Sequence, residues 1–201
     1  MTDAPDFFTT ARTMRAHRAF TDAPVADELV ERVLETATYA PSAENTQPWV
    51  FVVVRDPATR AAIGEVTKRA WEAGGRDYAQ ARLDASFFAD VDRGATGGVS
   101  GAPVLVVVGA DRTHCAAPAL DASIFPAVQN LLLAAHALGL GSALTTLPTV
   151  LGDVLRERVG LPDHVLPIAV VPLGWPARTL GPPRRTPVAE KTHRDRFGTP
   201  W

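Results

Sequence analysis

Side chains that donate and accept hydrogen bonds without carrying charge are concentrated in residues 40–51, APSAENTQPWVF. Hydroxyl and amide groups suit the edge of a heterocycle that mixes carbonyl and NH groups. Pro41 lacks a backbone donor and biases the residue before it away from helical angles, so a preceding helix should end here. The stretch predicts a binding loop, with a capped helix end and a polar turn as the alternative. The polar side chains that define it are Ser42, Asn45, Thr46 and Gln47.

Arginines that could bind a phosphate occur near both ends of the chain. Arg15 and Arg18 lie three residues apart in MRAHRAF, and they would share one face if a helix over residues 6–15 continues through them. Arg184 and Arg185 form a second basic pair within a proline-rich tail. The alternative is a solvated charged surface, which is the commoner reason for such a pair.

The sequence gives little support to other kinds of chemistry. The five histidines are scattered without metal-ligand spacing, and the single Cys115 excludes an internal disulfide and indicates a reducing, cytoplasmic location. The stretch GVSGA lacks the second glycine of a nucleophile elbow, and GLGSAL lacks the dinucleotide fingerprint. A net charge of −2 argues against a nucleic-acid partner, and neither a signal peptide nor a membrane-spanning run is recognisable.

Hydrophobic periodicity predicts the elements that would position these residues. With 201 residues, 46% of them hydrophobic, the chain has enough apolar material for one domain spanning residues 1–201. Asp56 and Pro57 are typical of a helix start, and Gly160 is typical of a helix end. Helices are predicted at 6–15, 27–39, 57–74, 121–138 and 149–159, and strands at 49–55, 103–109 and 165–174, with a short strand or an extended loop at 142–147.

For three of these elements the sequence also predicts burial or position in the sheet. The β-branched run over residues 49–55 predicts a strand buried on both faces. The long helix is apolar nearly all round and should be the central buried helix, so Gln129 and Asn130 would need partners inside. Pro167 and Pro172 interrupt the last strand, which predicts an edge or bulged position for it.

Two segments are not predicted to pack into the hydrophobic core. Residues 76–101 contain one predicted helix and a glycine-rich stretch, and we expect a variable, mobile flap there. Residues 175–201 are rich in proline and have no continuous apolar face, so the tail is either disordered or ordered against a partner. Phe197 and Trp201 favour a partner, and we expect the tail to embrace a second subunit.

Four motifs in order, MRAHRAF, APSAENTQPWVFVVV, SIFPAVQNLLLAAHALGLGS and PPRRTPVAEK, resemble the FMN-dependent nitroreductase family. The resemblance covers nearly the whole chain except residues 76–101. It implies an α+β fold with a central mixed β-sheet flanked by helices. It also implies a homodimer in which the C-terminal extension is exchanged, with FMN at each of two interface sites.

The resemblance assigns roles to individual residues. The phosphate and ribityl end of FMN would be held by Arg15 and Arg18, joined by Arg184 and Arg185, and Ala16 of the first motif would also contact the cofactor. The polar edge of the isoalloxazine would meet, from the other subunit, Pro41, Ser42, Asn45 and Gln47. The backbone near N5 would be that of Thr145, Thr146 and Leu147. The chain departs from the family pattern at Met14 and Ala16, where arginine and serine are common. It also departs in the loop near N5, which often contains proline and glutamate in the best known branch and here reads Leu144, Thr145 and Thr146.

The implied activity is transfer of hydride from NADH or NADPH, through flavin N5, to nitroaromatics, quinones or similar electron-poor acceptors by a ping-pong mechanism. The cofactor carries this chemistry, so no catalytic side chain and no metal is required. Two alternatives stay open. The first is a flavin-binding protein without turnover, and the second is a family relative that destroys the flavin or dehalogenates an aromatic substrate. Neither nucleic acid nor a membrane is an expected partner.

Overall fold

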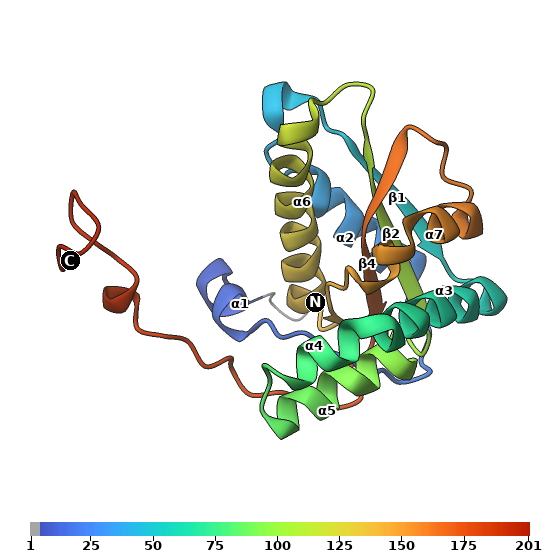
Figure 1. The fold of residues 1–201 in the computed structure, drawn as a ribbon, viewed down its shortest axis with the longest axis horizontal. Helices are drawn as coiled ribbons and strands as arrows, with labels where there is room; N and C mark the ends of the chain where they lie inside the picture. The colour runs from blue at the N-terminus through green and yellow to red at the C-terminus, as the bar shows by residue number, and fades with distance from the viewer. Residues whose placement is uncertain (1–4) are drawn as a thin grey trace.

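A four-stranded antiparallel sheet forms the centre of the computed structural model, which describes residues 5–201 (Figure 1). Its strands, in spatial order, are β1 (Trp49–Val54), β2 (Val104–Asp111), β4 (Val165–Gly174) and β3 (Gly141–Ser142). The α+β class is confirmed. A mixed sheet was predicted, whereas the strand pairs of this sheet are all antiparallel. Within the described residues, parallel pairing is limited to one bridge between Ala16 and Ser142. Long connections permit either strand direction, so apolar periodicity could not decide it.

β2 lies in the middle of the fold and is buried on both faces. Val106 and Val108 point into a core formed with α2 (Asp27–Thr38) and α6 (Ala117–Ala137). Leu105 and Val107 point into a second core formed with α3 (Pro57–Ala70) and α7 (Gly152–Val159). Because successive side chains of a strand face opposite ways, a strand covered by helices on both sides must be apolar throughout. Figure 1 shows the two helical layers on opposite sides of the sheet.

The helix boundaries follow the local signals in the sequence. Asp56 accepts a hydrogen bond from the backbone N of Thr59 at 2.7 Å, and Pro57 occupies the first turn of α3, as predicted. Gly160 ends α7 in the left-handed conformation, with a φ of 67°, which favours glycine because a side chain is strained there.

Two strand predictions need correction or refinement. β1 is an edge strand whose residues are mostly half-buried, so it is not buried on both faces. β4 is an inner strand paired on both sides, so the predicted edge position is wrong. The predicted bulge is present, because the register shifts between Val108 and Gly109, opposite Pro167. A proline that cannot donate to the ladder is tolerated beside this irregularity.

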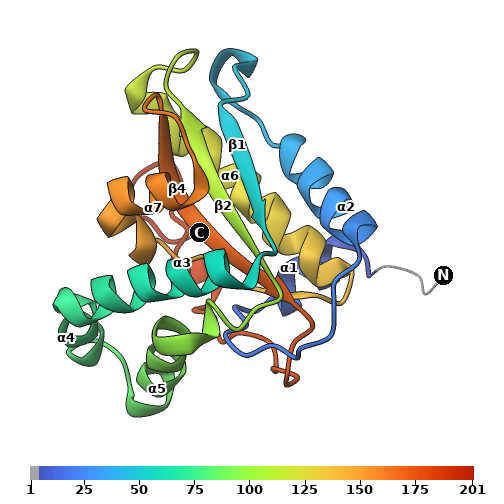
Figure 2. The ribbon, with the colours of Figure 1, turned by 90° about the vertical axis from the view of Figure 1, so that its right-hand side faces the viewer.

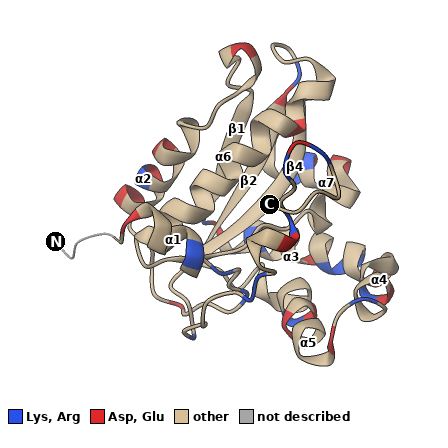
Figure 3. Cartoon of the chain, turned by 90° about the vertical axis from the view of Figure 1, so that its left-hand side faces the viewer, with Lys and Arg blue, Asp and Glu red and all other residues tan. Residues whose placement is uncertain are grey.

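α6 packs against the sheet with one face and leaves the other face uncovered. Gln129 is exposed, so the prediction that it needs an interior partner is wrong, whereas half-buried Asn130 donates to the carbonyl of Thr36 at 3.4 Å. The uncovered face includes Phe125, which is partly exposed. Figure 3 shows that almost no charged residue interrupts α6. An apolar helix face without a cover within the described chain is an unusual feature of a water-exposed surface.

The N-terminal helix is shorter than predicted. α1 (Phe7–Thr13) ends before the two arginines of MRAHRAF, so Arg15 and Arg18 do not share a helical face. The chain leaves the helix because it pairs with the edge of the sheet instead. The backbone N of His17 donates to the carbonyl of Ser142 at 2.8 Å. In an extended segment, residues three apart point to opposite faces, so strand alternation does not place Arg15 and Arg18 on one side either.

The segment predicted as a flap, residues 76–101, is helical and has a small core of its own. It contains α4 (Arg76–Gln80), α5 (Ala85–Arg93) and the π turn η3 (Gly94–Gly98), and it follows another π turn, η2 (Trp71–Gly75). Buried Trp71 packs against Phe88 with ring centroids 6.1 Å apart. Figure 2 shows α4 and α5 together at one end of the sheet. We refer to residues 76–101 as the flap.

The C-terminal tail is anchored only at its beginning. The indole N of Trp175 donates to the carbonyl of Pro24 at 3.1 Å, and the backbone N of Ala177 donates to the carbonyl of Ala19 at 3.0 Å. Arg178 then pairs with Asp90, and the carbonyl of Gly181 accepts from Arg15. Beyond residue 185 the tail extends away from the body and contains one short 3-10 turn, η5 (Val188–Glu190) (Figure 1). Its apolar side chains are left in solvent: Val188 is 77% exposed, Phe197 94% and Trp201 71%.

Candidate active site

A cavity of about 820 Å³ lies where the N-terminal segment, α5 and the start of the tail meet. We call it the arginine cavity, and its volume is in the range of small-molecule sites. Leu132 of α6 and Ser142 of β3 also contribute to its wall. The structure therefore brings together the five residues that the sequence assigned to a phosphate end, which are Arg15, Ala16, Arg18, Arg184 and Arg185.

Three of these arginines have no carboxylate partner among residues 5–201. Arg15 donates to the carbonyl of Gly181, and Arg185 donates to the carbonyl of its neighbour Arg184 at 3.0 Å. Guanidinium groups that converge on one cavity without neutralising carboxylates create a positive potential. Their planar donors match the geometry of a phosphate or carboxylate. The cavity is suited to an anionic group.

Two acidic residues line the arginine cavity as well, and each has a local role. Asp84 caps α5, and its pKa is lowered mainly by the hydrogen bond from the backbone N of Phe87, with the charge of Arg184 as a smaller cause. Asp90 forms an ion pair with Arg18 at 3.1 Å. Arg18 thus differs from Arg15, Arg184 and Arg185 in having a carboxylate partner, which it shares with Arg178, another arginine of the cavity wall.

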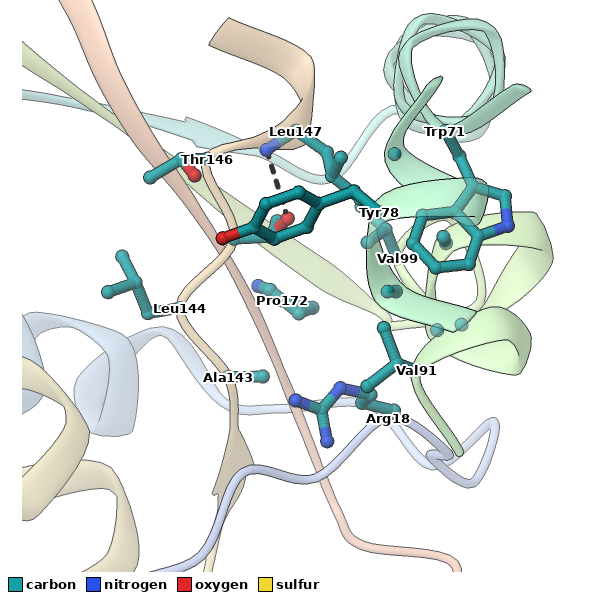
Figure 4. Close-up of a pocket in the computed structure, with 16 residues that line it drawn as sticks. Arg18, Trp71, Tyr78, Val91, Val99, Ala143, Leu144, Thr146, Leu147 and Pro172 are labelled. Atoms are coloured by element: carbon teal, nitrogen blue, oxygen red, sulfur yellow. Dashed lines mark hydrogen bonds between the residues drawn. The ribbon is translucent and has the colours of Figure 1, made fainter. Parts of the chain in front are cut away.

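A second, smaller cavity of about 300 Å³ adjoins the first, and we call it the aromatic pocket (Figure 4). Trp71 and Tyr78 line one side of it, and residues 143–147 line the other. Arg18 lines both cavities and, among residues 5–201, is the only charged residue in the wall of the aromatic pocket. In Figure 4 the Tyr78 ring and the Arg18 guanidinium enclose the pocket from opposite ends.

The backbone of residues 145–147 offers one free donor beside the aromatic pocket. The N of Thr145 donates to the carbonyl of Val170 at 3.0 Å, and the N of Leu147 donates to Oγ1 of Thr145 at 3.3 Å. Within the described chain the N–H of Thr146 has no such acceptor. Of the three residues assigned to the N5 region, Thr146 is therefore the one whose amide is available to a ligand.

The polar loop predicted to bind the heterocycle lies elsewhere. Pro41, Ser42, Asn45 and Gln47 line neither cavity, because η1 (Ala43–Asn45) sits at the N-terminal end of α6, where the backbone N of Ala43 donates to Oγ of Ser123 at 3.1 Å. Ser123 is roughly 14 Å along the helix axis from Leu132, at 1.5 Å per residue. One chain therefore does not assemble all the predicted site residues in one place.

This loop is strained in a way that the sequence did not reveal. Glu44, Asn45 and Gln47 all have positive φ angles, of 53°, 55° and 49°. Only asparagine among them adopts this region readily, so the other two carry a conformational cost. Oγ of Ser42 accepts from the backbone N of Gln47 at 3.0 Å and holds the turn. Strain of this kind is concentrated at binding sites, where it preorganises the backbone.

Two histidines lie behind the arginine cavity. His17 is buried, and burial lowers its pKa, with the positive potentials of His136, Arg15 and Arg178 as smaller causes. Burial also lowers the pKa of His136, whose Nε2 lies 2.9 Å from Oγ1 of Thr13. Both shifts favour the neutral form of the imidazole in the folded chain.

We expect the free energy of unfolding to fall as the pH drops below about 6.5, where the unfolded chain takes up these protons and the folded chain resists them. Each histidine can contribute a slope of up to about 1.4 kcal/mol per pH unit between its folded and unfolded pKa values. Urea unfolding between about pH 7.5 and 5.5 measures the slope. His17→Gln should flatten it, and His193→Gln, in the exposed tail, is the control. An unchanged slope in His17→Gln would contradict the assignment.

Residues 5–201 contain no group of three or more histidine, cysteine, aspartate or glutamate residues that could hold a metal ion. Across the same residues, no helix is long and apolar enough to cross a membrane.

The fold and the two adjoining cavities define an α+β protein that can hold an anionic ligand beside an apolar, aromatic-lined pocket. The chain belongs to the nitroreductase family, whose model, described as "Nitroreductase family", matches residues 11–175. The family resemblance of the sequence motifs is thereby confirmed, and with it the class of enzyme, a nitroreductase-like oxidoreductase.

Individual relatives agree with this assignment. A candidate NADH dehydrogenase/NAD(P)H nitroreductase of Methanothermobacter thermautotrophicus is 34% identical over 181 residues, covering 88% of this chain and 80% of the relative. An iodotyrosine deiodinase of Hydra vulgaris is 28% identical, covering 92% of this chain and 71% of the relative. A candidate nitroreductase of Desulfovibrio desulfuricans, solved in complex with FMN, is 29% identical with a TM-score of 0.76, covering 97% of this chain and 99% of that one.

Proposed function

We propose that this chain is an FMN-dependent oxidoreductase that uses NADH or NADPH to reduce nitroaromatics, quinones or similar electron-poor acceptors. The observation that carries the proposal is the set of uncompensated arginines facing a cavity that adjoins an aromatic pocket and the free amide of Thr146. When bound, FMN supplies the redox chemistry by accepting hydride at N5 and passing it to the acceptor.

In this proposal the residues of the chain bind and orient the cofactor and the acceptor. Arg15, Arg184 and Arg185 would hold the phosphate, because they have donors to offer and no carboxylate to satisfy. The Thr146 amide would donate to the cofactor edge where negative charge accumulates on reduction. The apolar wall of the aromatic pocket, including Trp71 and Leu147, would exclude water from the acceptor.

We also propose that the working unit is a homodimer. The loop containing Ser42, Asn45 and Gln47 is strained as binding loops are, yet it is remote from both cavities of its own chain, so a second copy would have to present it. The uncovered apolar face of α6 and the exposed side chains of the tail are available to bury between the copies. Free, buried Cys115 is consistent with a location in the reducing cytoplasm.

The proposal is tested by loading the purified protein with FMN and mixing it with NADH or NADPH in a stopped-flow instrument. Bleaching of the flavin, followed by recolouring with nitrobenzene or 1,4-benzoquinone, is the expected result. Because both substrates would use one site in turn, double-reciprocal plots should be parallel, as for ping-pong kinetics. Intersecting plots would reject the shared site, and a flavin that binds without bleaching would indicate a binding protein without turnover.

The similarity to an iodotyrosine deiodinase suggests 3-iodotyrosine as a second substrate to be tested. Iodotyrosine carries an ammonium and a carboxylate, which need charged partners when they are bound away from water. The aromatic pocket has only Arg18, and that residue is paired with Asp90. We therefore expect dithionite-reduced protein to leave 3-iodotyrosine unchanged while it reduces 1,4-benzoquinone. Release of iodide at a comparable rate would reverse this preference.

Replacing Thr146 with proline should slow flavin reduction by about 10²-fold, the typical cost of removing one donor aimed at developing negative charge. Thr146→Ala keeps the amide and should retain most of the rate. Proline also restricts φ to near −65°, whereas Thr146 has a φ of −106°, so flavin content and thermal unfolding must be compared in both variants. Equal reduction rates in the alanine and proline variants, at equal flavin content, would exclude this amide as the donor.

A further inference from the structure

We propose that Arg18 and Asp90 form a latch that fastens the flap over the aromatic pocket, so that Arg18 serves the acceptor side of the site and does not hold the phosphate. Asp90 is then a positioning residue that acts through Arg18. The identity of the acceptor that enters the pocket depends on the proposed function. The latch itself is inferred from contacts within the chain.

Asp90 is the common partner of three arginines from three parts of the chain. Arg18 comes from the N-terminal segment and its NH1 lies 3.1 Å from Oδ2 of Asp90. Arg178 comes from the start of the tail and donates to Oδ1 of the same carboxylate, and Arg93 of α5 lies 3.7 Å from that oxygen. The side chains of Arg18 and Asp90 are only 22% and 19% exposed. Ion pairs shielded from solvent in this way are screened less than surface pairs.

Arg18 also packs closely against side chains and backbone of the flap. Its guanidinium carbon lies 5.7 Å from the ring centroid of Phe87, within cation–π range. A Cβ added at Gly94 would lie 2.6 Å from Cδ of Arg18, and one added at Gly98 would overlap the backbone carbonyl oxygen of Arg18. Two of the three glycines of GATGG, Gly94 and Gly98, therefore allow the π turn to lie directly on Arg18. This gives a physical reason for the glycine-rich stretch.

The charge balance separates the role of Arg18 from that of the other arginines. Arg15, Arg184 and Arg185 have no carboxylate partner in the described chain, whereas Arg18 would have to leave Asp90 and Phe87 to reach a phosphate. Its place in the wall of both cavities means that its release would open the aromatic pocket without removing the anion-binding arginines.

The first test compares Arg18→Gln and Asp90→Asn with the parent protein, all loaded with FMN. Amide hydrogen exchange over residues 85–98 should speed up by about tenfold or more in both variants, since flap opening becomes easier. The KM for 1,4-benzoquinone should rise by about tenfold with little change in kcat, and the Kd for FMN should stay within about threefold. The double variant should resemble each single variant, because both break one latch.

A second pair of variants tests the latch without changing charge. Gly98→Ala should speed exchange over the flap, because its Cβ overlaps Arg18, whereas Gly97→Ala is the matched control, since nothing lies within 4 Å of a Cβ built there. Equal exchange in these two variants would overturn the packing part of the latch.

An FMN Kd that rises in Arg18→Gln as much as in Arg185→Ala would make Arg18 a phosphate ligand and overturn the proposal. Unchanged amide hydrogen exchange over residues 85–98 in Asp90→Asn would also overturn the proposal. If exchange changes as expected but NADH and NADPH bleach none of the proteins, the latch stands and the proposed oxidoreductase function fails.

Discussion

Replacing Arg185 with alanine is expected to weaken FMN binding by about tenfold to a hundredfold. A charge-assisted hydrogen bond is worth roughly 1.5 to 3 kcal/mol, and each 1.4 kcal/mol is a factor of ten in Kd. Arg185 lines the arginine cavity and has no carboxylate partner in the described chain. Its side chain donates only to the neighbouring Arg184 carbonyl, so its removal leaves no buried acceptor of the body unsatisfied. The loss should therefore appear in ligand affinity and not in folding.

Arg196→Ala is the matched control, because Arg196 is an exposed arginine of the same tail and lines neither cavity. Fluorescence titration gives the Kd of both variants for FMN and for riboflavin, which lacks the phosphate. The Arg185 variant should lose affinity for FMN but keep its affinity for riboflavin. Equal losses for both flavins, or equal FMN affinity in the two variants, would show that Arg185 does not bind the phosphate.

Deleting residues 187–201 is expected to weaken the dimer and, with it, FMN retention, while each subunit stays folded. The deletion leaves Arg184 and Arg185 in place and removes the exposed side chains of Val188, Phe197 and Trp201. The core clusters extend no further along the chain than Trp175, so the fold of the body does not depend on the deleted residues. Stable dimers of this kind bury on the order of 2,000 Å² or more, and losing a tail that contributes aromatic anchors should cost much of that.

Sedimentation velocity and thermal unfolding together measure this effect. At micromolar concentration the full chain should sediment as a dimer with FMN, and the shortened chain should sediment largely as a monomer with little flavin. Circular dichroism should show the same helix content in both. A shortened chain that remains a flavin-loaded dimer would mean that α6 and its neighbours form the interface without the tail.

The sequence alone predicted the elements whose boundaries depend on local chemistry. Asp56 and Pro57 start α3, and Gly160 ends α7, because capping and left-handed angles are properties of a few adjacent residues. The apolar run over residues 103–109 predicted the strand β2 for the same kind of reason. The arginine pairs also led to the prediction of an anion site, and the structure places all four arginines beside one cavity.

Only the tertiary structure decided which of these residues meet. β1 proved to be an edge strand and β4 an inner strand, because pairing partners are chosen across the sheet and not along the chain. Arg18 resembles Arg15 in the sequence, yet Asp90, distant along the chain, forms an ion pair with Arg18 and not with Arg15. The sequence could not reveal the positive φ angles of Glu44 and Gln47 either, since most glutamates and glutamines avoid them and tertiary contacts must impose the strain. Local propensity specified the parts of the site, and long-range packing determined the partner of each charge.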